Sequence, residues 1–274
     1  MTLDATSLLQ PSFFEAEIRP RYGKFYDAAT PLLNALNEFT LKAGKRSTPQ
    51  QAVIRNLCMM TGFAVHDVAI LVASGSGLGA LKITRSALEY AINAEYLRLF
   101  SDETIRYLNW NYIERHKQLN YMRARIPLEF AKLDAAIVAE SERMYREVRP
   151  LFLNKKGRLL SSWCTHSLLE RAKATNSEDV YHLIYVSGSG LSHGSFSGLA
   201  QHAEGFTDEG WQPAIPPSLT GCGPALQNVH FCGLRAVKTL CLMNNKDSTP
   251  PLLDLEKEFQ SSWAEYNASD SDAF

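Results

Sequence analysis

Two trios of polar residues in this sequence share a spacing of four positions and could form one reactive or ligand-binding site. The trios are Arg85, Glu89 and Asn93, and Tyr185, Ser189 and His193. Residues four positions apart lie on the same face of an α-helix, so each trio predicts a polar stripe. If the two stripes face one cavity, Arg85 would hold an anion such as phosphate, and His193 would act as a general acid or base.

The same six residues also fit a purely structural role. The catalytic candidates are Arg85, Glu89 and His193, and the ligand-binding candidates are Asn93, Tyr185 and Ser189. A buried ion pair between the arginine and the glutamate, with a hydrogen-bonded histidine, would fix the register of two helices. Structural ion-pair networks are common, so the sequence favours this second interpretation.

A repeated pentapeptide suggests how the stripes could meet. The sequence SGSGL occurs at residues 74–78 and again at residues 187–191, both within helical surroundings. A glycine costs a helix about 1 kcal/mol relative to alanine, so a compensating gain is expected. Because small residues let two helix axes approach closely, we expect these segments to cross in the core. Chance recurrence in a chain rich in glycine and serine is the alternative.

Apolar residues recur near a 3.6-residue period over most of the chain, and no segment shows sustained alternation. The sequence therefore predicts an all-α fold, a single multi-helix bundle domain with a long Gly/Pro-rich loop and a C-terminal helix. The expected helices span residues 22–42 (with a kink or break at Pro31), 49 onwards, 78–100, 103–125, 128–148, 163–175, 180–202, 224–244 and 252–266. Residues 205–223 form the expected ordered loop.

The chain divides into three parts by this pattern. We expect an N-terminal helical segment over residues 1–48, a helical core domain over 49–245, and a linker, C-terminal helix and disordered tail over 246–274. The small-residue helices and the last helix would offer contact surfaces, so we expect a homo-oligomer or another protein partner.

Composition narrows the classes of function. The 274 residues are 45% hydrophobic and 21% charged, with a net charge of -1. This balance gives no global field for nucleic acid, so RNA binding is disfavoured, and we expect a soluble, cytoplasmic protein without a membrane span. The five cysteines include no CxxC pair, and Asp179 and His182 have ligand spacing without a second copy. We therefore expect no disulfide, no metal and no cofactor.

Residues 68–80 match the sequence motif, or fingerprint, of a dinucleotide-binding fold. Gly75, Gly77 and Ala80 match GxGxxA after an apolar run, and Glu95 lies about 20 residues after Gly75, as expected for a ribose contact. The fingerprint requires a βαβ context, and the preceding residues have a helical pattern. A nucleotide-binding α/β protein therefore remains only an alternative.

Two stretches resemble a known family. The helix GLGALKITRSALEYAINAEYL at residues 77–97, and Trp163 followed by a Tyr…Tyr…Ser…His pattern at residues 181–193, are similar to the bacterial domain family of unknown function DUF5677. The likeness covers roughly residues 50–245 and implies an all-helical fold without an established chemistry. Helical proteins of this kind also resemble a nuclease superfamily of phage defence and toxin systems. Its Arg-x4–6-His motif is missing, because Arg158 and His166 are one residue too far apart.

The function predicted from the sequence is a helical binding protein. We expect a non-enzymatic interaction or ligand-binding module in a bacterial defence or stress system, with a polar Arg/Glu/His site. The first alternative is an RNA-acting, nuclease-like enzyme that uses Arg85 and His193. The second alternative is the nucleotide-binding α/β protein with its fingerprint at Gly75 to Ala80.

Overall fold

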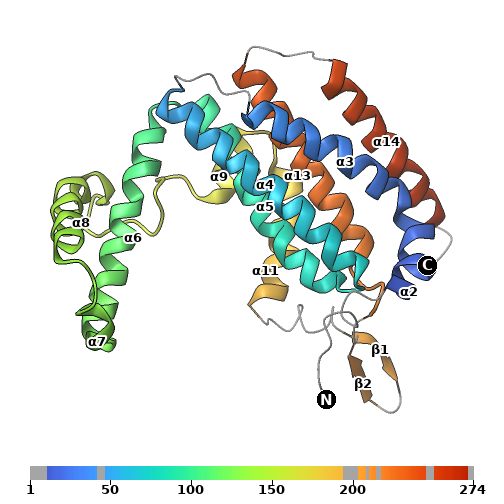
Figure 1. Ribbon diagram of the computed structural model, residues 1–274, viewed down its shortest axis with the longest axis horizontal. Coiled ribbons are helices and arrows are strands. Elements are labelled where there is room, and N and C mark those ends of the chain that lie inside the picture. Colours follow the sequence, from blue (N-terminus) through green and yellow to red (C-terminus); the bar gives the residue numbers. More distant parts are fainter. Residues whose placement is uncertain are drawn as a thin grey trace. The chain divides into compact units, whose positions relative to one another are not determined.

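The computed structural model describes residues 11–41, 47–193, 203–207, 210–213, 217–244 and 250–270. These residues are predominantly helical, so the predicted all-α fold is confirmed (Figure 1). Contacts divide the chain into two compact units. Unit 1 comprises Met1–Arg98 and Arg171–Phe274, and unit 2 comprises Leu99–Glu170.

The core of unit 1 is built from long helices. They are α3 (Arg19–Leu41), α4 (Pro49–Ala73), α5 (Gly77–Leu99), α13 (Cys222–Met243) and α14 (Pro250–Asp270). Helix α13 packs on both α3 and α4, and α14 packs on α3 and α13. Phe25, Ile54 and Leu226 are among the largest fully buried side chains of this core. Their burial removes apolar surface from water, which is the main force holding the helices together.

Helix α4 begins where the sequence predicts. Thr48 and Gln51 form a capping box, because the Thr48 hydroxyl accepts from the Gln51 N–H and the Gln51 side chain accepts from the Thr48 N–H, both at 3.2 Å. Among the described helices, α4 is the one long and apolar enough to cross a membrane by length and composition. Here it packs against α3 and α13, and ten of its residues are buried.

Several predicted helices differ from the observed ones. Pro31 lies inside α3 without ending it. The helix predicted over residues 163–175 is only α9 (Leu168–Ala174). The helix predicted over residues 180–202 begins as three consecutive short elements, and its part beyond His193 lies outside the described residues. These elements are α10 (Glu178–Val180), the π-helix η3 (Tyr181–Val186) and α11 (Ser187–Ser192). Another short helix, α2 (Pro11–Phe13), and the π-helix η1 (Phe14–Ile18) precede α3.

The segment predicted as a loop contains a small hairpin. Strands β1 (Ala203–Thr207) and β2 (Gly210–Pro213) pair antiparallel, with Phe206 opposite Trp211. The prediction of a loop over this part is therefore wrong. Strands of four and five residues show too little alternation of apolar and polar residues to be predicted from the sequence. Residues 214–216 lie outside the described part.

The α/β alternative is wrong. Residues 68–73, which would have to form a strand, are the last turns of helix α4. The strands that the structure describes form one antiparallel hairpin, whereas a dinucleotide fold needs a parallel sheet.

Unit 2 is a helical hairpin with an appended segment. Helices α6 (Glu103–Arg125) and α8 (Ala135–Val148) pack against each other, joined by the short α7 (Pro127–Phe130). The 3-10 helix η2 (Arg149–Phe152) follows. The predicted helix over 128–148 is therefore split. Asp134 starts a new helix, since its carboxylate accepts from the Ala136 N–H at 2.7 Å.

The three predicted parts are consecutive stretches of sequence, whereas the two observed units are defined by contacts and combine distant stretches. The three-part division therefore stays a prediction. Helix α14 extends to Asp270, four residues into the tail that was predicted to be disordered. The last four residues lie outside the described part of the chain.

Candidate functional site

Arg85 and Tyr185 meet in unit 1, as the two polar stripes require. The Arg85 Nη2 donates to the Tyr185 hydroxyl at 2.8 Å, and the guanidinium carbon lies 4.5 Å from the centre of the Tyr185 ring. The ring of Tyr181 stacks on that of Tyr185, with centroids 4.9 Å apart and planes inclined by 17°. The arginine is therefore positioned by a neutral aromatic pair.

The backbone around Gly188 makes this contact possible. A Cβ on Gly188 would lie 2.9 Å from the Arg85 Cβ and 3.1 Å from the Leu81 carbonyl oxygen. Only glycine permits so close an approach of α11 to α5. The expected crossing of the two SGSGL segments is therefore wrong, because the second copy meets α5 at Leu81 and Arg85, whereas the first copy lies against the residues at the start of α13 (217–222).

The segment from Tyr181 to Gly188 runs antiparallel to α5. Gly188 lies against Leu81 and Arg85. Tyr181, at the other end of the segment, lies close enough to Arg85 and Glu89 for their charges to affect its pKa. The pKa of Tyr181 is raised, chiefly by burial and then by the adjacent Tyr185; Arg85 acts to lower it and Glu89 to raise it. Tyr181, rather than Ser189, is therefore the residue of the second segment that lies near Glu89.

The antiparallel direction separates the other members of the trios. His193 follows Tyr185 by eight residues, or about 12 Å along a helix, in the direction away from Glu89. Its side chain is exposed and Ser189 is half-buried. The structure thus brings together Arg85 and Tyr185, and it does not bring His193 to either Arg85 or Glu89.

Asn93 takes part in a different interaction. Its side-chain oxygen accepts a hydrogen bond from Nη1 of Arg171, and both residues are about 95% buried. A buried arginine needs such acceptors because its charge is costly to remove from water. Asn93 is therefore engaged in the interior of unit 1, away from the surface where Arg85 meets Tyr185.

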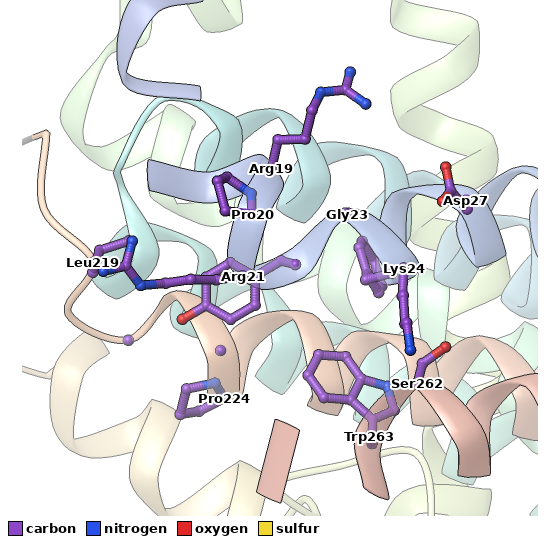
Figure 2. Close-up of a pocket in the computed structure, with 14 residues that line it drawn as sticks. Arg19, Pro20, Arg21, Gly23, Lys24, Asp27, Leu219, Pro224, Ser262 and Trp263 are labelled. Atoms are coloured by element: carbon purple, nitrogen blue, oxygen red, sulfur yellow. The ribbon is translucent and has the colours of Figure 1, made fainter. Parts of the chain in front are cut away.

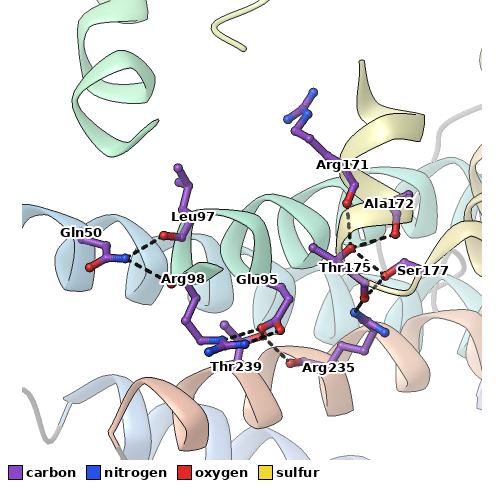
Figure 3. Close-up of polar contacts among 10 residues, drawn as sticks. All are labelled: Gln50, Glu95, Leu97, Arg98, Arg171, Ala172, Thr175, Ser177, Arg235 and Thr239. Atoms are coloured by element: carbon purple, nitrogen blue, oxygen red, sulfur yellow. Dashed lines mark hydrogen bonds and ion pairs between the residues drawn. The ribbon is translucent and has the colours of Figure 1, made fainter. Parts of the chain in front are cut away.

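A second polar network lies in the interior of the same unit (Figure 3). Arg98 donates to both oxygens of Glu95, at 2.8 and 3.0 Å, and the Thr239 hydroxyl donates to Glu95 at 3.0 Å. Burial acts to raise the pKa of Glu95, but these hydrogen bonds and the charges of Arg98 and Arg235 together lower it. The ribose role considered for Glu95 is wrong, because its carboxylate is occupied by Arg98 and Thr239.

Arg235 extends this network to the turn after α9. Its Nη2 donates to the Thr175 carbonyl at 2.8 Å, and the Thr175 hydroxyl lies 3.0 Å from that of Ser177 (Figure 3). Burial lowers the pKa of Arg235, and the nearby Glu95 counteracts this effect. The network joins α5, α13 and the residues after α9, which are far apart in sequence.

A pocket of about 1040 Å³ opens beside α3, the start of α13 and α14 (Figure 2). Its basic lining residues are Arg19, Arg21 and Lys24. Glu15 and Glu17 already pair with the two arginines, at 3.0 and 2.6 Å respectively. Because these carboxylates offset the positive charge, the pocket is less suited to an anion than the surroundings of Arg85.

No group of three or more His, Cys, Asp or Glu side chains that could hold a metal ion occurs among the residues that the structure describes. The five cysteines are free and buried.

The predominantly helical architecture agrees with the likeness seen in the sequence. A family model described as a family of unknown function (DUF5677) matches residues 53–210. The chain belongs to this family, and the matched residues include both members of the contact. No curated protein and no solved structure matches the chain.

Proposed function

We propose that the protein is a non-enzymatic binding protein and that Arg85 holds an anionic group of its ligand. One observation carries this proposal: the half-buried guanidinium of Arg85 is held by Tyr185, which is neutral, instead of by a carboxylate. An arginine placed in this way keeps its charge available for a carboxylate or a phosphate.

The hydrogen-bonding state of Arg85 supports this role. Its Nε is buried and has no hydrogen-bond partner among the described residues. Glu89 lies one helical turn away, but no ion pair joins it to Arg85 among the contacts of the described chain. A bound oxyanion would supply acceptors for the guanidinium, and charge-assisted bonds of this kind are about twice as strong as neutral ones.

The aromatic pair adds pre-organisation. Because Tyr185 contacts the guanidinium through both its hydroxyl and its ring, and Tyr181 stacks behind it, the arginine loses little side-chain freedom when a ligand arrives. This arrangement suits a ligand with one anionic group.

The geometry favours binding over catalysis. A general acid or base must reach the reacting group within hydrogen-bond distance. His193 is displaced by two turns along its own segment from the residue that touches Arg85, which does not favour the alternative of an RNA-acting enzyme. A role in a bacterial defence or stress system rests on the resemblance to helical nucleases alone, and a phage-plating assay with a deletion strain tests it.

The test compares anion binding in matched variants. Isothermal titration of the wild-type protein with inorganic phosphate and with acetate is expected to show saturable binding of one of them at or below about 10 mM. Arg85→Ala abolishes this signal, whereas Arg19→Ala leaves it unchanged, because Arg19 is already paired with Glu15. Tyr185→Phe weakens it through loss of the hydroxyl contact, with helical content checked by circular dichroism.

Two results would overturn the proposal. One is the same anion response in wild-type protein and Arg85→Ala, or no response to either anion. The other is cleavage of a labelled single-stranded RNA that is lost in His193→Ala while the fold is retained, since this outcome would make the protein an enzyme.

A further inference from the structure

The helical hairpin of unit 2 carries an apolar surface at the turn between its two helices. Five large side chains within 17 positions are 38 to 81% exposed: Tyr121, Ile126, Leu128, Leu133 and Ile137. They lie on the last turn of α6, on α7 and its flanks, and on the first turn of α8 (Figure 1). We call this surface the hairpin tip.

The exposed side chains are not a consequence of loose packing. Nearer the middle of the hairpin, the His116 ring stacks on that of Tyr145 with centroids 3.5 Å apart, and Arg123 is ion-paired with Glu142. An Asp134 cap fixes the start of α8. The turn is thus well ordered by specific contacts, and its apolar side chains are presented outwards from a rigid support.

Two helices alone cannot enclose an apolar layer, because each buries only one stripe against the other. Of the 15 exposed large hydrophobic residues in the described chain, ten belong to unit 2, which has 72 residues. Exposed large apolar side chains that gather in one segment are a feature of interaction sites in natural proteins.

The charges around the hairpin tip indicate what covers it. Residues 121–142 carry both signs in nearly equal number, with the basic residues Arg123, Arg125 and Lys132 and the acidic residues Glu129, Asp134, Glu140 and Glu142. Such a rim gives no attraction to RNA or to an anionic membrane, which both need excess positive charge. A surface that carries both signs can instead face a second copy of itself under two-fold symmetry, since each copy offers partners for the other.

Arg125 is a basic residue of the hairpin tip that is available for an ion pair with a second copy. It is exposed and has no hydrogen-bond or ion-pair partner among the described residues. The neighbouring basic residues differ, since Lys132 is paired with Glu129 at 2.7 Å and Arg123 with Glu142. In a two-fold contact each Arg125 could join one of these ion pairs on the opposite tip, giving two equivalent interactions.

We propose that the hairpin tip is a homodimer interface, in which the tips of two copies pack against each other through their apolar side chains. The exposed fractions correspond to roughly 500 Å² per copy, since a large side chain buries on the order of 150–250 Å². Two copies then bury about 1,000 Å², at the lower end for a specific interface. A dimer with so small an interface is expected to dissociate on dilution. This inference rests on unit 2 alone and is independent of the role proposed for Arg85.

Sedimentation velocity of the full chain from about 1 to about 200 μM tests this proposal. The wild-type protein is expected to shift from monomer to dimer over this range. Leu128→Glu, which changes the most exposed side chain of the hairpin tip, is expected to weaken dimerisation at least 10-fold, and Arg125→Glu more mildly. Phe63→Glu on α4 is the matched control, because Phe63 is also exposed, at 55%, but lies in unit 1. It is expected to dimerise as the wild-type protein does.

Three outcomes would overturn the inference. A wild-type protein that stays monomeric throughout shows that something other than a second copy covers the hairpin tip. Dimers that persist in Leu128→Glu but are lost in Phe63→Glu assign the interface to α4. Co-sedimentation with phosphatidylserine vesicles that is lost in Leu128→Glu assigns the hairpin tip to a membrane. Circular dichroism of each variant shows that its fold is retained.

Discussion

The indole N–H of Trp263 donates a hydrogen bond to Nδ1 of His230 at 3.2 Å. Because Nδ1 accepts this bond, the proton of the neutral imidazole is on Nε2. His230 is fully buried, and the rings of Phe25 and Phe259 lie against it with centroids 5.5 and 4.9 Å away. Its Nε2 has no hydrogen-bond partner among the described residues. The contact thus joins α14 to α13 around a histidine that is kept neutral.

This arrangement predicts a loss of stability in mild acid. Burial lowers the pKa of His230 from 6.5 to about 4, so below pH 6.5 the unfolded chain binds a proton that the folded chain does not. The contribution of the neutral His230 to the free energy of unfolding is fully present above pH 6.5. It is lost as the pH falls towards 4, by about 3 kcal/mol in total. Urea unfolding between pH 7.5 and pH 5 is expected to show about 2 kcal/mol of this decrease.

The histidine variants separate this effect from other titrations. His230→Gln is expected to remove most of the decrease between pH 7.5 and pH 5, whatever its effect on stability at neutral pH. His66→Gln is the control, because the His66 side chain is 63% exposed, and it should retain the wild-type slope. Equal slopes in all three proteins would contradict the assignment to His230.

Glu95 and Arg98 are predicted to stabilise unit 1 as a pair. Glu95→Gln leaves Arg98 and the nearby Arg235 without their carboxylate in a largely buried setting, so a loss of about 3 kcal/mol is expected by urea unfolding. Because the pKa of Glu95 is lowered from 4.5, this contribution is present above pH 4.5 and is lost below it.

An exposed pair provides the comparison. Glu129 and Lys132 are 56 and 69% exposed at their side chains, so Glu129→Gln is expected to change the stability by less than about 1 kcal/mol. Similar losses in the two variants would show that the interior network contributes no more than a surface ion pair.

The long helices could be predicted because their signals are local. Thr48, Pro49 and Gln51 start α4 through a capping box that is legible in four residues. The break between α7 and α8 was missed, since the residues before Asp134 contain neither glycine nor proline and the apolar pattern continues across them. The π-helix at Tyr181–Val186 has no sequence pattern of its own, because its wider turn depends on packing against α5.

The site was predicted only in part for a related reason. Four-residue spacing identified two helix faces but predicted no particular contact between them, and the contact that the structure shows joins Arg85 to Tyr185. It did not fix the direction in which the second segment runs along α5, and this direction decides that Tyr181 rather than His193 lies near Glu89. The contact of Asn93 with Arg171 joins residues far apart in sequence, which no spacing rule detects.

The cysteines are predicted to be unreactive in the folded protein. All five are buried, and burial raises the pKa of Cys222 to about 11 and that of Cys232 to about 12. Since the thiolate is the nucleophile, Ellman's reagent at pH 8 should label none of them within minutes, and all five once urea unfolds the chain. Rapid labelling of even one thiol in the native protein would show that its surroundings open to solvent.

Gly77 is predicted to be the glycine of α5 that tolerates no side chain. A Cβ there would lie 2.4 Å from both the Cys222 nitrogen and the Thr220 oxygen, which are backbone atoms at the start of α13 and cannot rotate away. Gly77→Ala must therefore separate α5 from α13, and a loss of about 3 kcal/mol in urea unfolding is expected. Gly23→Ala is the matched control inside α3, where the nearest atom to a new Cβ is 3.9 Å away. There the higher helix propensity of alanine should raise stability by up to about 1 kcal/mol. If Gly77→Ala were as stable as Gly23→Ala, the close approach of α5 to the start of α13 would be wrong.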